Sequence, residues 1–152
     1  MDSLSYVSLA YASYSMALVV NSPVLSRGPL YLLETRKLRN SLSTRVLGAV
    51  FFVYLDIIID PVTLQGSKWF LGQIYGYPQK GPYFGVPLSN FAGWLIVGFL
   101  MIYALQFIDA RLEGGGTRDY AGHRYPWRYL IGPGLYSGVL VFNLAVTFAI
   151  RD

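Results

Sequence analysis

Four long apolar stretches constrain the fold of this chain more than any other feature of its sequence. They cover residues 4–25, 46–62, 91–108 and 129–150, and the last two contain no charged residue. A helix needs about 20 apolar residues to cross the hydrocarbon core of a bilayer. Only helices and closed barrels satisfy their backbone hydrogen bonds in lipid, and barrel strands alternate apolar and polar residues. The sequence therefore predicts an all-α integral-membrane bundle, a single transmembrane domain of about four helices over residues 1–152.

The amino-acid composition agrees with a membrane protein and excludes several other classes. Hydrophobic residues make up 54% of the chain and charged residues 13%, whereas soluble domains carry roughly 25% charged residues. Disordered proteins have the opposite balance, with low hydrophobicity and high charge. The chain has no cysteine, which excludes a disulfide scaffold, a thiolate zinc site and a cysteine nucleophile.

The first apolar stretch, residues 4–25, is rich in Ser and Tyr. We therefore expect it to pack against other helices or line a cavity rather than to face lipid. No basic segment precedes it and no cleavage site of small residues is evident, so it is predicted to be a retained helix and not a secretory signal.

The basic residues are distributed unevenly among the loops. Nine of the 12 lysines and arginines lie in residues 26–45 and 109–128. Positive loops prefer the cytoplasmic side, so we expect an integral protein of the plasma membrane with both termini on the non-cytoplasmic side. The basic residues of the two cytoplasmic loops account for the net charge of +4. We therefore expect no nucleic-acid partner. Residues 27–45 mix leucines with cations, which allows an amphipathic helix at the headgroups or a helical extension with solvated cations.

The loop between the second and third stretches, residues 64–90, interleaves Gly and Pro with aromatic side chains. Loops that face only water seldom hold so many aromatic residues, here Trp69, Phe70, Tyr75, Tyr77, Tyr83 and Phe84. We expect this loop to fold back onto the membrane face and cover an opening. An interfacial aromatic belt is the alternative.

Two aspartates in the second stretch are the strongest local signal for chemistry. Asp56 and Asp60 are four residues apart in an otherwise apolar run, so a helix places both carboxyl groups on one face, with Cβ atoms about 6 Å apart. An ionised carboxylate near the membrane centre costs at least ~2.5–3.5 kcal/mol, and such residues usually face a cavity and have a function. Two carboxyl groups this close disfavour double ionisation, which leaves one of them with the proton that a general acid requires.

A structural role is the alternative for Asp60, which could cap a backbone turn or pair with Lys68. Pro61 follows directly, and we expect it to end or kink the helix just after Asp60.

The segment at residues 81–94, GPYFGVPLSNFAGW, is the second signal. Ser89 or Asn90 is suited to cap the third helix. Both also place oriented polar groups at the membrane edge, beside the aromatic faces of Tyr83, Phe84, Phe91 and Trp94. Together with Tyr54, such faces suit a conjugated or isoprenoid ligand and can stabilise a carbocation through cation–π attraction; simple helix packing is the alternative.

Metal and nucleotide chemistry have no support in the sequence. His123 is the only histidine, and Asp119 is the one acidic residue close to it. No phosphate-binding loop, dinucleotide fingerprint or zinc-protease motif is present. We therefore expect no metal and no cofactor.

The run DIIIDP at residues 56–61, then Trp69, then YFGVPLSNFAGW at residues 83–94, resembles the integral-membrane carotenoid biosynthesis protein family. That family includes γ-carotene 1′-hydroxylase and bisanhydrobacterioruberin hydratase. The likeness runs from the first stretch to the third and thins after Ile108. Family members are usually longer, with further membrane helices before the matched part, so this chain resembles their C-terminal part.

The resemblance implies cofactor-independent addition of water to the terminal C1,2 double bond of an acyclic carotenoid end group. Asp56 or Asp60 would protonate the double bond, and Asn90 or the other carboxylate would hold the water. The substrate-binding residues would be aromatic: Tyr54, Trp69, Tyr83, Phe84, Phe91 and Trp94.

The implied partners are a carotenoid or other long isoprenoid, the lipid bilayer, and a second copy or another membrane chain. A non-catalytic carotenoid- or lipid-binding subunit is the alternative function. A small transporter that uses the two aspartates has no motif behind it.

Overall fold

The computed structural model of the protein describes residues 3–22, 24–25, 31–32, 35–68, 72, 75–112 and 128–151. Its long helices are α1 (Ser3–Asn21), α3 (Leu42–Thr63), α4 (Leu88–Leu112) and α6 (Arg128–Arg151). The short elements are the strands β1 (Val24–Leu25) and β2 (Tyr31–Leu32), helix α2 (Arg36–Arg39) and the 3-10 turn η1 (Gly66–Lys68). The prediction of an all-α membrane bundle is confirmed, apart from the two-residue antiparallel pair of β1 and β2.

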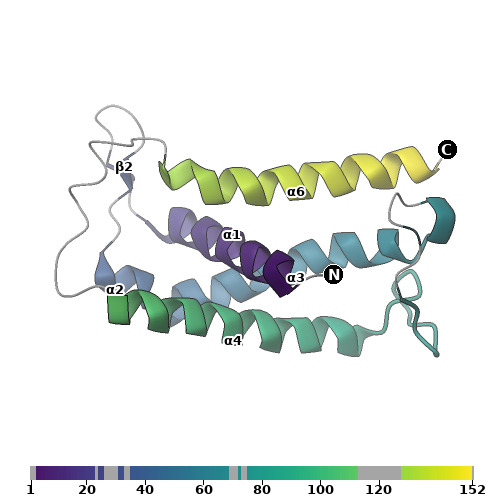
Figure 1. The fold of residues 1–152 in the computed structure, drawn as a ribbon, viewed down its shortest axis with the longest axis horizontal. Helices are drawn as coiled ribbons and strands as arrows, with labels where there is room; N and C mark the ends of the chain where they lie inside the picture. Colours follow the sequence, from purple (N-terminus) through teal and green to yellow (C-terminus); the bar gives the residue numbers. More distant parts are fainter. Residues whose placement is uncertain are drawn as a thin grey trace.

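Three helices in the described part of the chain are long and apolar enough to cross a membrane, over Leu42–Thr63, Leu88–Leu112 and Tyr129–Ile150. Helix α1 lies between α6 and α4 and contacts α3, α4 and α6 (Figure 1). The loop between α3 and α4 lies at one end of the bundle, and α2 lies at the other end (Figure 1).

Helix α1 packs closely because its buried side chains are mostly small. Ala10, Ala12, Ser13 and Ala17 are fully buried. Small residues at helix interfaces let backbones approach each other, and here α1 supplies them over two consecutive turns. The expectation that the Ser- and Tyr-rich stretch packs against other helices is confirmed.

Helix α2 is tied to the bundle through a buried arginine. The Nε of Arg39 donates to Oδ2 of Asp109 on α4 at 3.1 Å, and the Arg39 backbone carbonyl accepts from Gln106 at 2.7 Å and from Tyr14 at 3.1 Å. Residues 27–30 and 33–34 lie outside the described residues; in the described part of this segment, the prediction of solvated cations is wrong at Arg39. Helix α2 has only four residues; Arg39 is buried rather than solvated, whereas Arg36 and Lys37 are exposed.

The second predicted helix ends within one residue of the predicted position, whereas the predicted cap of the third is wrong. Helix α3 ends at Thr63, two residues after Pro61, and the Leu64 N–H donates to the Asp60 carbonyl at 3.3 Å. Helix α4 begins at Leu88, so neither Ser89 nor Asn90 caps it. The Asn90 backbone N–H donates to the Pro87 carbonyl at 3.0 Å, which leaves the Asn90 side chain for another role.

Gly98 allows close contact between α4 and α3, and Gly98→Ala is expected to destabilise the bundle. A Cβ at this position would lie 2.9 Å from Cδ1 of Phe52, which is too close for carbon atoms. Overpacking of this kind typically costs about 1–3 kcal/mol. Thermal unfolding in detergent should show a lower midpoint than that of the unchanged protein.

Gly134→Ala on α6 is the matched control for this measurement, since among the described residues nothing lies within 4 Å of a Cβ there. Alanine is favoured over glycine in a helix by up to ~1 kcal/mol, so the control should unfold at an equal or higher temperature. Equal midpoints for the two variants would contradict the close α3–α4 contact.

Candidate active site

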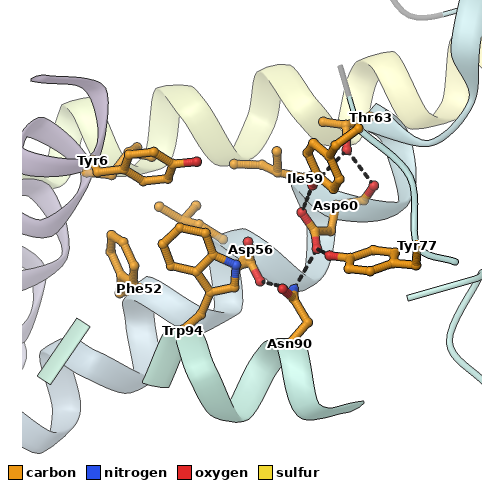
Figure 2. A pocket seen from close by; sticks show the side chains of 12 residues that line it. Tyr6, Phe52, Asp56, Ile59, Asp60, Thr63, Tyr77, Asn90 and Trp94 are labelled. Atoms are coloured by element: carbon orange, nitrogen blue, oxygen red, sulfur yellow. Dashed lines mark hydrogen bonds between the residues drawn. The ribbon is translucent and has the colours of Figure 1, made fainter. Parts of the chain in front are cut away.

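A cavity of about 330 Å³ lies between α1, α3, α4 and the loop that joins α3 to α4 (Figure 2). Helix α3 supplies half of its lining residues. The full lining is Tyr6, Leu9, Phe52, Leu55, Asp56, Ile59, Asp60, Thr63, Tyr75, Tyr77, Asn90 and Trp94. Apolar side chains make most of the wall, and the polar groups gather at one end of it (Figure 2).

Asp56 and Asp60 lie on the cavity-facing side of α3 and share one hydrogen-bond donor. The Asn90 amide nitrogen donates to Oδ2 of Asp60 at 2.7 Å and to Oδ2 of Asp56 at 3.2 Å. Asp60 is only 3% exposed, whereas Asp56 is partly exposed toward the cavity. The predicted placement of both carboxyl groups on one face is confirmed, and one amide from α4 bridges them.

The Asp60 carboxyl group is held by two tyrosines of the loop. The Tyr77 hydroxyl donates to Oδ2 at 2.9 Å, and the Tyr75 hydroxyl donates to Oδ1. The Thr63 hydroxyl lies 3.1 Å from the Tyr75 hydroxyl and 2.8 Å from the Asp60 backbone carbonyl oxygen. With Asn90, the side chain of Asp60 therefore accepts three hydrogen bonds.

The hydroxyl groups of Tyr75 and Tyr77 stay protonated and act as hydrogen-bond donors. Burial raises the pKa of Tyr75 and of Tyr77, and the hydrogen bond from each hydroxyl to Asp60 raises each pKa further. A phenol whose pKa is raised keeps its proton at physiological pH. Both hydroxyls therefore donate to Asp60, and the loop is anchored to the end of α3 through this carboxyl group.

An aromatic wall faces the carboxyl groups. The Trp94 ring stacks on the Tyr6 ring with centroids 5.0 Å apart and planes 24° apart. The Phe52 ring is tilted against Trp94 at 5.9 Å. Figure 2 shows Trp94 beside Asp56, so a ligand that reaches this carboxyl group also meets the faces of aromatic rings.

A family model described as Carotenoid biosynthesis protein matches residues 4–149. The chain belongs to this family. The match continues beyond Ile108, where the motif likeness thins, through most of α6. No curated protein and no solved structure matches the chain. Membership supports a role in carotenoid biosynthesis, and the spanning helices are consistent with association with isoprenoids and lipid.

Four of the predicted site residues of this carotenoid biosynthesis protein come together at the cavity, namely Asp56, Asp60, Asn90 and Trp94. Tyr54 is not among the described lining residues. It precedes Asp56 by two positions, which turns it by about 200° around the helix, and it is 49% exposed on the outer side of α3. Trp69 lies outside the described residues.

Three aromatic residues of the YFGVPLSNF run pack together and are not among the described lining residues of the cavity: Tyr83, Phe84 and Phe91. The Tyr83 ring packs edge-on against Phe84 at 5.0 Å and against Phe91 at 5.7 Å. The reason is a tight turn, closed by hydrogen bonds from the Gly81 N–H to the Gly85 carbonyl and from the Val86 N–H to the Tyr83 carbonyl. The turn directs the Tyr83 and Phe84 rings toward each other.

Eight lining residues were not predicted as site residues: Tyr6, Leu9, Phe52, Leu55, Ile59, Thr63, Tyr75 and Tyr77. Phe52 could have been found, because it lies one helical turn before Asp56 and so shares its face. The aromatic loop was expected to cover an opening, yet no local pattern distinguishes Tyr75 and Tyr77 from its other aromatic residues. Within the described residues, no group of three or more His, Cys, Asp or Glu comes together.

Proposed function

We propose that the protein hydrates the terminal C1,2 double bond of an acyclic carotenoid end group without a cofactor. The observation that carries this proposal is the pair of carboxyl groups, bridged by the Asn90 amide, at the polar end of an aromatic cavity. Acid-catalysed hydration of an alkene needs a proton donor, a surface that stabilises a carbocation, and a place for water. The cavity offers a candidate for each.

The hydrogen bonds divide the two carboxyl groups into different roles. Asp60 accepts hydrogen bonds from Tyr75, Tyr77 and Asn90, and charge-assisted hydrogen bonds of this kind stabilise a carboxylate. Among the described residues, Asp56 accepts one side-chain hydrogen bond, from Asn90. Two negative charges this close in an apolar cavity are unfavourable. We therefore assign the negative charge to Asp60 and the transferable proton to Asp56.

The reaction then balances as a simple addition of water. The π electrons of the double bond take the Asp56 proton and form a C–H bond at C2, which leaves a tertiary carbocation at C1. The rings of Trp94, Tyr6 and Phe52 supply cation–π stabilisation. A lone pair of water forms the C1–O bond, and the proton that water releases returns to the Asp56 carboxylate. The Asn90 amide oxygen can accept a hydrogen bond from that water.

The experiment that tests this function is pigment analysis in cells that accumulate lycopene or γ-carotene. Expression of the protein should give a product heavier by one water, detected by chromatography and mass spectrometry. The double variant Asp56→Asn, Asp60→Asn, present in the membrane at the same level, should give none. Unmodified carotenoid that copurifies with a protein giving no product would instead favour the non-catalytic binding subunit.

A further inference from the structure

A second cavity lies along α4, next to the candidate active site. Its volume is about 410 Å³, and it is lined by Tyr77, Pro87, Ser89, Asn90, Gly93, Trp94 and Val97. Five of these residues belong to α4 and span eight helical steps, which corresponds to about 12 Å along the helix axis. We call this second cavity the α4 groove.

The α4 groove and the active-site cavity share a wall. Tyr77, Asn90 and Trp94 line both of them. On α4, residues four positions apart form rows along one face, so Asn90 and Trp94 form one row, and Ser89, Gly93 and Val97 form the row beside it. The shared row therefore faces the carboxyl groups on one side and the α4 groove on the other.

The size of the active-site cavity makes a continuation necessary. Small-molecule pockets measure about 300–1,000 Å³, so a cavity of about 330 Å³ accommodates one end group and not a whole carotenoid. A carotenoid is several times longer than its end group and stays linear because its double bonds are conjugated. Its remaining chain must leave the cavity along an apolar path, and the α4 groove starts at the cavity wall.

Gly93 lines the α4 groove, and close helix packing does not require a glycine there. At Gly98 and Gly48 an added Cβ would lie 2.9 Å from Phe52 and 2.7 Å from Ile102, so close helix contacts account for those glycines. At Gly93 no described atom lies within 4 Å of an added Cβ. A side chain at this position would project into the α4 groove instead of into a neighbouring helix.

We infer that the α4 groove binds the polyene chain of the substrate while the end group occupies the active-site cavity, and that Gly93 determines the length of chain accepted. This inference rests on the proposed hydration. It makes Gly93 a specificity-determining position that lies outside the described lining of the active-site cavity and does not participate in proton transfer.

The test compares a long and a short substrate in purified protein. Lycopene is the long probe, and a short acyclic isoprenoid with the same end group is the second. Gly93→Phe should lower the hydration of lycopene at least tenfold and change that of the short probe less than twofold. Gly138→Phe on α6 is the matched control, because that position is also open among the described residues and lines neither cavity; it should change neither rate.

Several results would overturn the inference. Unchanged hydration of lycopene by Gly93→Phe would do so, and so would equal loss of both activities in folded protein. A wild-type dimer that becomes a monomer in Gly93→Phe would show that a second copy covers the α4 groove. If the wild-type protein hydrates neither probe, the proposed function fails separately; lycopene retained by wild type and lost from Gly93→Phe then still supports the groove, and equal retention overturns it.

Discussion

Replacing Asp56 with asparagine is expected to slow hydration strongly while the protein keeps its fold and its pigment. Asparagine has nearly the same shape, and it can still accept the hydrogen bond that Asn90 donates to Asp56, but it has no acidic proton. General acid catalysis typically contributes ~10²–10⁴-fold to a rate. We therefore expect the initial rate of product formation to fall by at least ~10²-fold, measured with lycopene by chromatography.

Two further variants separate proton donation from simple packing. Asp56→Glu restores the carboxyl group, but its longer side chain shifts the acidic proton by one methylene group. We therefore expect this variant to recover only part of the activity. Tyr54→Phe, two residues earlier on the exposed side of α3, should leave the rate unchanged. Hydration by Asp56→Asn at the wild-type rate would remove Asp56 from the acid role and transfer that role to Asp60.

Replacing Asp60 with asparagine is expected to lower both stability and activity, because this carboxyl group is an acceptor for three donors. The Asn amide nitrogen cannot accept, so at least one donor among Tyr75, Tyr77 and Asn90 loses its partner. Each buried polar group left unsatisfied costs roughly 1–3 kcal/mol. Thermal unfolding in detergent should show a lower midpoint, and pigment analysis should show little product.

A double-mutant cycle with Tyr77→Phe makes this expectation specific to the hydrogen bond. Coupled residues give non-additive changes in stability, so Tyr77→Phe should destabilise the wild-type protein and have little further effect beside Asp60→Asn. Tyr54→Phe serves as the control, since it also removes one tyrosine hydroxyl but should show no coupling to Asp60. Additive effects of Tyr77→Phe and Asp60→Asn would contradict the role of Asp60 as the anchor of the loop.

The role of Asn90 could be predicted only in part from the local sequence. Its position before an apolar run suggested either a helix cap or a polar site group, and the two alternatives could not be separated from spacing alone. The structure places it in the first turn of α4 with its amide on both aspartates. The deciding factor is the packing of α4 against α3, which brings residues 30 and 34 positions apart into contact.

The aromatic residues also differ in whether they reach the cavity, and the local sequence does not predict which of them do. Trp94 belongs to a motif run and lines the cavity, whereas Tyr83 and Phe84 from that run are turned away by the tight turn that contains them. Tyr75 and Tyr77 reach Asp60 from the loop, although nothing in their immediate sequence predicts it. A side chain in a loop is oriented by the path of the backbone, and that path depends on contacts with the helices beneath it.

The sequence by itself determined that this protein is a helical membrane bundle with two carboxyl groups on one helix face. Both conclusions follow from local physics, since long uncharged stretches need lipid or protein around them and a spacing of four residues returns to the same side of a helix. Only the tertiary structure decided which groups hold those carboxyl groups, that Arg39 is buried, and where the α4 groove lies. These features depend on contacts between elements distant in the chain, and such contacts arise from helix packing rather than from any single stretch of residues.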